Sequence, residues 1–425
     1  MPRVLLVTTT TGYQTRSFDE AARRLGIDLV FATDRCDQLD DPWRDSAIPI
    51  RFHTEDDSVR TISEAVRTKS IDGVLALADK AAPLAARSAL ALGLPGHPPE
   101  ATRVAGNKLA SRLAFRNSKL LTPWFKSSDL NDAPERLAMD VSYPCVLKPL
   151  SLSGSRGVIK TDDPQGFVKA FVRLRQLLQR RTIQALRDPS SSQIIIEGFI
   201  DGDEFALEGV LENGKLQIFA LFDKPDRLDG PFFEETIYVT PSRLSSTIQE
   251  AITREIRLAI DLLGLGHGPI HAECRVNAKG VWILEVAARP IGGLCARTLR
   301  FVRSKKDLAC EREGLEAVLL RHAVGESIRS YTRETCASAV MMLPIPMRGR
   351  LRSVEGIEKA AQITGIEEVR ITAKTDQLLE PIPEGASYLG FVFARAESPE
   401  LAVYALKSAH AQLNFKIERP LDFCE

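Results

Sequence analysis

Two carboxylates on a candidate β-hairpin constrain this chain more than any other feature of its sequence. Residues 270–276 and 281–287 are short runs typical of β-strands, and Asn277 to Gly280 between them has the composition of a tight turn. Glu273 lies on the first strand and Glu285 on the second. The pattern predicts that both side chains point to one face of a sheet.

The length of the loop decides whether the two glutamates meet. Both lie six positions from Lys279, so a three-residue loop at 278–280 places them directly opposite each other. A two-residue loop at 278–279 shifts the register and leaves an ordinary hairpin with two solvated glutamates. Opposed carboxylates repel, with Cβ atoms roughly 5 Å apart, so the paired register requires a cation between them. Carboxylates without a Cys–His cage favour a hard cation such as Mg²⁺.

The bulk composition excludes several classes of protein. The 425 residues are enough for two or three domains, and 56 basic residues balance 56 acidic ones, which argues against nucleic-acid or anionic-membrane binding. No apolar run approaches the roughly 20 residues of a membrane span, and the first residues read as a strand instead of a signal peptide, so a cytoplasmic protein is expected. The seven cysteines are scattered, which indicates neither a zinc site nor a disulfide framework.

The N-terminal hundred residues predict a parallel α/β domain, because strands alternate with helices. The strands are expected at 3–8, 28–33 and 72–79 and the helices at 17–25 and 59–68. The turn from Thr8 to Gly12 lacks the G-x-G-x-x-G dinucleotide fingerprint. This domain is therefore expected to hold a small substrate or to shape the site at the carboxyl ends of its strands.

Two segments carry lysines suited to phosphate. Lys148 ends a strand and precedes a flexible Ser/Gly loop at 150–157, which can close over phosphates although its spacing is not that of a Walker P-loop. A serine-rich loop without a ligand is the alternative. Lys108 and Arg112 share one face of a helix, which is either a solvated basic face or part of a site.

The strand from Gln193 to Ile200 runs into a short polar connection that can offer backbone groups to an adenine edge, and Glu204 can accept hydrogen bonds from ribose hydroxyls. The charged loop at 222–236 is predicted to line a site. Further elements are expected as helices at 165–187, 245–263, 314–324, 355–362 and 398–410 and strands at 205–211, 215–222, 338–343, 367–372 and 388–394. The part beyond about residue 305 indicates no chemistry and reads as a cap or dimerisation unit.

Taken in order, these motifs resemble the ATP-grasp superfamily of carboxylate–amine ligases over roughly residues 104 to 300. The motifs are Lys108, Leu147-Lys148-Pro149 with its Ser/Gly loop, Glu197 to Glu204, Glu273, and Glu285-Val-Ala-Ala-Arg289. The resemblance implies a mixed α/β and α+β fold with three parts. These are a parallel α/β pre-ATP-grasp domain at 1–103, an ATP-grasp domain at 104–305 with a nucleotide-closing subdomain at about 142–204, and a C-terminal α+β cap at 306–425.

The same resemblance implies roles for individual residues, with ATP and Mg²⁺ as cofactors and Mn²⁺ as an alternative ion. Glu273 and Glu285 would hold the metal, and Ala287 stands where much of the superfamily has an asparagine ligand. Lys148 and Arg289 would stabilise the transferred phosphoryl group. The implied ATP-binding residues are Lys108, Lys148, Ser153, Gly154, Ser155 and Gly157 for the phosphates, Glu197, Phe199 and Ile200 at the adenine hinge, and Glu204 at the ribose.

The Glu-x-Ala-Ala-Arg motif followed by two glycines is similar to the L-amino acid ligases, the dipeptide-forming branch. In that branch Arg289, Gly292 and Gly293 would border the amino-acid site, and His271 either contacts substrate or is structural. The implied reaction joins an amino-acid carboxylate to an amine through an acyl phosphate. The alternatives are a bicarbonate-using carboxylase of the same fold and a non-catalytic ATP-binding regulatory protein. Expected partners are small molecules, with a homodimer as the commonest assembly.

Overall fold

The computed structural model describes residues 1–9, 14–34, 47–303 and 312–419. Its N-terminal part is a four-stranded parallel sheet in the order β3-β2-β1-β4, as the alternation of strands and helices predicted. The strands are β1 (Arg3–Thr8), β2 (Asp28–Thr33), β3 (Ile48–Pro49) and β4 (Gly73–Ala76), and the helices are α1 (Thr15–Leu25), α2 (Glu55–Ala65), α3 (Ala82–Ala91) and α4 (Pro99–Ala105).

Two features of this part differ from the expectation. Helix α2 begins four residues earlier than expected, where three acidic residues in its first turn complement the helix dipole. Strand β4 ends at Ala76, so Asp79 lies just beyond the carboxyl end of the sheet, in a short 3₁₀ turn (Asp79–Ala81). The predicted turn from Thr8 to Gly12 falls mostly outside the described residues.

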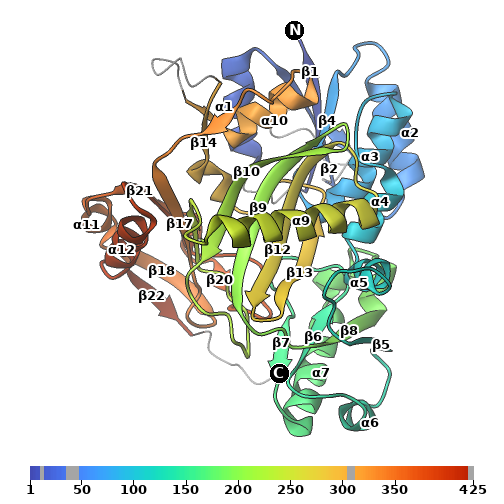
Figure 1. Cartoon of the computed structure of the whole chain (residues 1–425), viewed down its shortest axis with the longest axis vertical. Helices are drawn as coiled ribbons and strands as arrows, with labels where there is room; N and C mark the ends of the chain where they lie inside the picture. Colours follow the sequence, from blue (N-terminus) through green and yellow to red (C-terminus); the bar gives the residue numbers. More distant parts are fainter. Residues whose placement is uncertain (10–13, 35–46, 304–311, 420–425) are drawn as a thin grey trace.

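An eight-stranded sheet forms the centre of the molecule, in the order β13-β12-β9-β10-β11-β17-β21-β19 (Figure 1). Its strands are β9 (Asp203–Glu212), β10 (Lys215–Lys224), β11 (Ile237–Thr240), β12 (Gly268–Asn277), β13 (Gly280–Ala287), β17 (Ala337–Leu343), β19 (Ile366–Ile371) and β21 (Gly390–Ala396). Helix α9 (Ser246–Leu263) lies across one face, where Ile252 and Ile256 are fully buried. Gly264 ends it in the left-handed conformation, at φ 76°.

A smaller subdomain stands beside this sheet, with four antiparallel strands in the order β5-β8-β6-β7 (Figure 1). The strands are β5 (Phe125–Asp129), β6 (Cys145–Pro149), β7 (Ile159–Thr161) and β8 (Gln193–Gly198). Helix α7 (Pro164–Leu178) packs Phe167 and Phe171 against them. We call this subdomain the lid. Helices α5 (Lys108–Phe115) and α6 (Pro134–Met139) precede its strands β5 and β6.

The single helix expected at 165–187 is wrong. Helix α7 ends at Leu178, Arg180 takes an extended backbone with φ −58° and ψ 140°, and a short helix α8 (Arg181–Gln184) follows. The Arg180 guanidinium pairs with Glu380 at 2.8 Å, a contact 200 positions away that no local pattern contains.

The C-terminal region extends the central sheet instead of standing apart from it, because β17, β19 and β21 come from it. The remaining elements are α10 (Leu315–Ala323), α11 (Ile357–Ala361) and α12 (Pro399–His410), one small sheet of β14 (Arg300–Val302), β15 (Glu313–Gly314) and β16 (Thr332–Arg333), and another of β18 (Gly349–Glu355), β20 (Leu378–Leu379) and β22 (Asn414–Glu418). Within the described ranges, no helix combines the length and apolarity that crossing a membrane requires.

Candidate active site

A cavity of about 350 Å³ opens where the lid, the central sheet, the N-terminal domain and the C-terminal region meet. Most residues implied as site residues from the sequence line it. They are Lys108, Lys148, Ser153, Gly154, Ser155, Glu197, Phe199, Ile200, Glu204, His271, Glu273, Glu285, Arg289, Gly292 and Gly293. Of the implied set, Gly157 does not line the cavity; the C-terminal region adds Met342, Ala386 and Tyr388, which the sequence did not indicate.

Glu273 and Glu285 are paired across strands β12 and β13, as predicted, but for a different reason. The three-residue loop is wrong: Asn277 pairs with Gly280, so the turn has two residues. In a regular ladder that turn would place Glu273 opposite Leu284. A β-bulge between Cys274 and Glu273 shifts the register by one residue and restores the pairing with Glu285.

The bulge is held by a buried arginine of α5. Arg112 donates to the carbonyl oxygens of Ile283 (2.9 Å) and Leu284 (3.3 Å), and its Nε donates to Glu197 at 2.7 Å. Only 3% of its side chain is exposed, so the solvated basic face considered for this helix is wrong at Arg112. Sequence reasoning noted Arg112 but gave it no role.

Glu197 joins this arginine to Lys148, whose Nζ lies 2.6 Å from the other carboxylate oxygen. Burial raises the pKa of Glu197, but the two cations outweigh it and lower the pKa to about 2. The carboxylate is therefore ionised and fixes the position of the Lys148 ammonium at the cavity wall. The side chain of Glu197 thus holds Lys148 in place, and the backbone after it is the segment that the resemblance implies as the adenine hinge.

The hinge from Gly198 to Ile200 lines the cavity through Phe199 and Ile200. The amides of Gly198 and Phe199 donate to Trp124 and Pro144, each at 3.0 Å. Among the described residues no hydrogen bond engages the Ile200 amide, whereas its carbonyl accepts one from Arg275 at 2.6 Å. The hinge therefore presents one free backbone donor beside the cavity.

The Ser/Gly loop of residues 151–157, here called the phosphate loop, is fastened at its start by Lys108. The Lys108 Nζ donates to the carbonyl of Leu152 at 2.8 Å and lies 3.5 Å from Glu285. Gly154 and Ser155 have φ values of 63° and 55°, a conformation that glycine adopts without strain. Gly157 packs instead against α7, where an added Cβ would lie 2.9 Å from Leu174.

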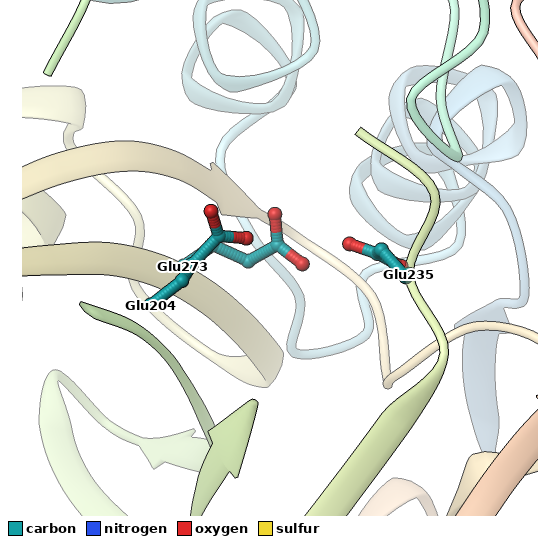
Figure 2. Close-up of side chains that lie close together, drawn as sticks. All are labelled: Glu204, Glu235 and Glu273. Carbon is teal, nitrogen blue, oxygen red and sulfur yellow. The ribbon is translucent and has the colours of Figure 1, made fainter. Parts of the chain in front are cut away.

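Three carboxylates that line the cavity, those of Glu204, Glu235 and Glu273, lie close together (Figure 2). Their oxygens lie within 4.8 Å of one another, a spacing suited to a metal ion. The ammonium of Lys224 already lies among them, at 2.8 Å from Glu204, 2.9 Å from Glu235 and 2.8 Å from Glu273. This cluster therefore contains its own cation.

The electrostatics of the cluster follow from its burial. Burial lowers the pKa of Lys224, but the three carboxylates outweigh it and the net shift is upward. Burial, offset in part by Lys224, raises the pKa of Glu235 to about 7. The loop at 222–236 was predicted to line a site, and it does so through Phe233 and Glu235. Lys224 itself was missed.

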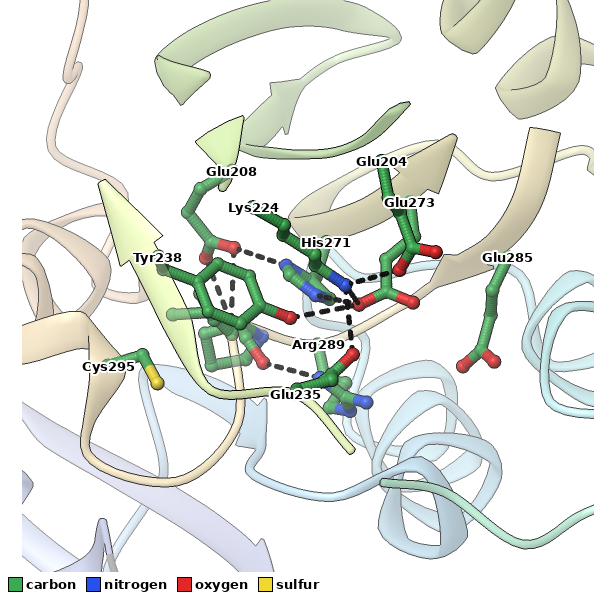
Figure 3. Close-up of polar contacts among 12 residues, drawn as sticks. Glu204, Glu208, Lys224, Glu235, Tyr238, His271, Glu273, Glu285, Arg289 and Cys295 are labelled. Atoms are coloured by element: carbon green, nitrogen blue, oxygen red, sulfur yellow. Dashed lines mark hydrogen bonds and ion pairs between the residues drawn. The ribbon is translucent and has the colours of Figure 1, made fainter. Parts of the chain in front are cut away.

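Glu204 accepts hydrogen bonds from both Lys224 (2.8 Å) and Arg275 (2.9 Å), so its two oxygens already have protein partners. Among the residues that the structure describes, Glu273 is hydrogen-bonded through Oε1 alone, to Lys224 and the Tyr238 hydroxyl (3.1 Å). Figure 3 shows the contacts of Lys224 and Tyr238 with these glutamates, with Glu285 lying apart from them.

The free oxygens fit a divalent cation. Among the described residues no hydrogen bond reaches Glu273 Oε2, and the Glu285 carboxylate has only the Lys108 contact. Two opposed carboxylates with uncommitted oxygens are suitable ligands for a hard cation. The residues present therefore fit the metal that the sequence implies.

His271 lies beside Glu273 and is paired across the sheet with Glu208. Its Nδ1 is 3.1 Å from Glu208 and its Nε2 is 3.6 Å from Glu273. Burial lowers the pKa of His271, but the two carboxylates outweigh it and raise the pKa to about 9. Glu208, which also accepts the Ile291 amide at 3.1 Å, was missed because a glutamate inside a strand gave no local signal.

Arg289 is held by Asp79 of the N-terminal domain. Its Nε and one terminal nitrogen donate to the two carboxylate oxygens at 2.8 and 2.9 Å. Asp79 ends the segment predicted as strand 72–79, at the carboxyl edge where a parallel sheet binds ligands. The N-terminal domain therefore shapes the site, as expected, through this residue.

The opposite end of the cavity is mainly apolar. Gly292 and Gly293 border it with Ile291, Cys295, Met342 and Tyr388. Gly293 has φ 61°, and an added Cβ would lie 3.1 Å from the Phe391 ring. No local pattern in the sequence indicated that strand β17 brings Met342 into this site.

The sequence matches three family models: "ATP-grasp N-terminal domain" over residues 19–96, "ATP-grasp domain" over 141–298, and "L-amino acid ligase C-terminal domain 2" over 341–418. Residues 141–298 of the chain therefore match the ATP-grasp domain, with matching N-terminal and C-terminal parts on either side. The predicted fold and the resemblance to L-amino acid ligases are confirmed.

Individual proteins and structures are also similar to this chain. The crystal structure of the L-amino acid ligase from Bacillus licheniformis superimposes with a TM-score of 0.80, covering 99% of each chain at 24% identity. The uncharacterized protein y4rH of Sinorhizobium fredii is 24% identical over 98% of this chain and 84% of its own length. Alanine–anticapsin ligase of Bacillus subtilis is 24% identical over 47% of this chain, which spans 44% of that relative.

Proposed function

We propose that this ATP-grasp protein joins the carboxylate of one amino acid to the amine of a second, through an acyl phosphate, releasing ADP and phosphate. One observation carries the proposal: a single cavity has a lysine-lined end and a largely apolar end, and the Glu273–Glu285 pair lies on its wall. Two similar proteins, named L-amino acid ligase and alanine–anticapsin ligase, support a ligase that acts on amino acids.

ATP would occupy the end of the cavity formed by the lid. Lys108, Lys148 and the phosphate loop would contact its phosphates, because these groups present cations and backbone amides to one space. The free Ile200 amide would donate to the adenine edge, and Phe199 would border the base. Glu204, whose oxygens each have one protein donor, retains lone pairs for a ribose hydroxyl.

Glu273 and Glu285 would hold the divalent cation, which is Mg²⁺ in this proposal, with Mn²⁺ accepted by the same oxygen ligands. When bound, the ion draws charge from the phosphate oxygens of ATP. Ala287 offers no side-chain ligand where a third could stand, and Lys224 fills the neighbouring carboxylate cluster. We therefore propose that these two glutamates supply the protein's metal ligands.

Phosphoryl transfer to the substrate carboxylate needs positive charge that is fixed in place. Lys148 is fixed by Glu197 and Arg289 by Asp79, so both cations are positioned before the substrates bind. The amine then attacks the acyl phosphate carbonyl, and phosphate leaves. No protein nucleophile takes part, and the phosphate loop excludes water from an intermediate that hydrolyses readily.

One assay tests the proposal: phosphate released from ATP and Mg²⁺ is measured with single amino acids, with pairs of amino acids, and with bicarbonate. Release that depends on amino acids, together with an amide product, supports the ligase. Release that depends on bicarbonate would replace it with the carboxylase, and nucleotide binding without release would replace it with the regulatory protein.

The metal assignment has a separate test. Glu285→Gln keeps the size of the side chain and removes its charge, so turnover should be abolished while the variant keeps the wild-type melting temperature within a few degrees. Wild-type activity in Glu285→Gln would refute the assignment.

A further inference from the structure

The segment of residues 380–388, here called the strap, lies between the lid and the substrate end of the cavity. Two of its glutamates make ion pairs with arginines of the lid. Glu384 accepts two hydrogen bonds from Arg173 of α7, at 2.5 and 2.8 Å, and Glu380 accepts one from Arg180 at 2.8 Å. The C-terminal region thus contacts the lid through two glutamate side chains, one on each side of a turn.

The same turn holds the end of the phosphate loop through the backbone. The Gly157 amide donates to the carbonyl of Pro383 at 2.9 Å, and Arg156 Nε donates to the carbonyl of Glu384 at 3.0 Å. Lys108 fastens the other end of the loop at Leu152. The residues between these two attachments face the cavity, so the strap sets one of the two fixed points of the loop.

The far end of the strap borders the space assigned to the amino acid. Ala386 and Tyr388 line the cavity, and the Tyr388 ring packs edge-on against Phe391 at 6.1 Å. The next residue, Leu389, donates its amide to Leu343 of β17 at 2.9 Å, which anchors the strap to the central sheet. A substrate that contacts Ala386 or Tyr388 therefore touches the same nine-residue segment that holds the phosphate loop.

We propose that the strap couples the two ends of the active site: an amino acid bound against Ala386 and Tyr388 favours the position of Pro383 and Glu384 in which the phosphate loop is closed. By linkage, a closed loop over ATP also favours amino-acid binding. The consequence is that phosphoryl transfer proceeds when the acceptor is present, and the acyl phosphate is shielded from water. Glu384 and Arg173 are positioning residues, since they act on the loop and not on the reacting atoms.

The inference rests on the proposed ligase function and adds a device that the function does not require. It is tested in the full chain with Glu384→Gln and Arg173→Gln, which remove the ion pair and leave the backbone contacts. The readout is phosphate released per amide formed, with the amino-acid pair that gives the highest release. Wild type should give a ratio near one, and each variant should release about five times more phosphate per amide, within the usual range of coupling between sites.

The double variant should match either single variant, because both remove the same contact. The matched control is Glu418→Gln, which removes the exposed pair with Arg352 (2.7 Å) elsewhere in the C-terminal region and should keep the wild-type ratio. A folded Glu384→Gln and a folded Arg173→Gln that both keep the wild-type ratio would overturn the proposal.

Hydrogen exchange at residues 151–157 tests the coupling without turnover. With ADP and Mg²⁺ bound, adding the same amino acids should slow exchange of the loop in wild type and leave it unchanged in Glu384→Gln. An equal slowing of exchange in both proteins, or no slowing in wild type, would overturn the proposed coupling through the strap. If wild type forms no amide, the ligase proposal fails and the exchange experiment still decides the coupling.

Discussion

Arg289 forms a two-point ion pair with Asp79, a residue 210 positions earlier in the chain. The pair joins the end of the β12–β13 hairpin to the carboxyl edge of the N-terminal sheet. Its geometry fixes a planar guanidinium at the cavity wall, where its remaining nitrogen donates to the Pro290 carbonyl at 3.0 Å. The N-terminal domain thus contributes to the site by orienting a cation.

Asp79→Asn should therefore reduce kcat strongly while leaving the fold intact. The amide cannot accept two hydrogen bonds from the guanidinium in the same way, so Arg289 should shift away from the position that we propose for phosphoryl transfer. Misplacement of about 1 Å reduces rates by about 100-fold. Steady-state kinetics check this, with Asp72→Asn, at the other end of the same strand, as the control. A wild-type kcat in Asp79→Asn would show that the pair is only structural.

Lys224→Met should convert the three-carboxylate cluster into a metal site. Without the ammonium, Glu204, Glu235 and Glu273 repel one another, and removing one partner of a buried charge cluster costs about 3–5 kcal/mol of stability. A divalent cation can replace the lost charge. Thermal unfolding with Ca²⁺ and without nucleotide should then show a larger rise in melting temperature for Lys224→Met than for wild type.

The Ca²⁺ experiment is repeated in the Glu285→Gln background, which removes the proposed catalytic metal site from both proteins. The difference between Lys224→Met and wild type should persist there. Equal Ca²⁺ responses in the two proteins would show that the cluster does not need a cation.

Local sequence patterns predicted the hairpin that carries the site residues, but not the residues that hold those side chains in place. The hairpin, its two glutamates and Arg289 lie within 26 residues, so spacing along the strands predicted their shared face. The carbonyl of Leu284 at the bulge accepts a hydrogen bond from Arg112, and no rule of turn composition contains that contact. The correct pairing was thus reached through an incorrect loop.

The missed residues share one physical property: their roles come from contacts distant in sequence. Lys224 lies 49 positions from Glu273, and Glu208 lies 63 positions from His271. Each lies on a strand, where the sequence gives no sign of a special role. The order of strands in the sheet places each beside a carboxylate or an imidazole. The strap is a further case. Residues 380–388 show no helical or strand periodicity, and their proposed role follows from their contacts with the lid.

Two buried histidines predict a loss of stability in acid. Burial lowers the pKa of His97 and of His322 to about 4, and each ring has one buried nitrogen without a hydrogen bond among the described residues. Both groups bind a proton more readily in the unfolded chain, near pH 6.5. Their contribution is therefore complete above about pH 6.5 and is lost as the pH falls toward 4.

Chemical denaturation at pH 7 and pH 5 measures this effect, which should reach roughly 1–2 kcal/mol for each histidine. His97→Asn should reduce the dependence on pH clearly, whereas His53→Asn should reduce it by a smaller amount, because His53 is exposed and slight burial with nearby cations lowers its pKa less. An unchanged pH dependence in His97→Asn would show that His97 does not titrate in this range. His271, whose pKa is raised to about 9, contributes in the opposite sense: its stabilisation is complete below about pH 6.5 and is lost as the pH rises through 9.

Met342 should set the size of the substrate side chain, if the apolar end of the cavity receives one. Its side chain lines that end with its sulfur 3.8 Å from Cys295 Sγ, while the neighbouring Met341 belongs to the core on the other side of the sheet. Met342→Ala enlarges the pocket, so kcat/KM for a large apolar amino acid should rise about tenfold relative to that for alanine. Met341→Ala removes the same volume from the opposite face and should lower stability without changing this preference. An unchanged preference in Met342→Ala would place the substrate side chain elsewhere in the cavity.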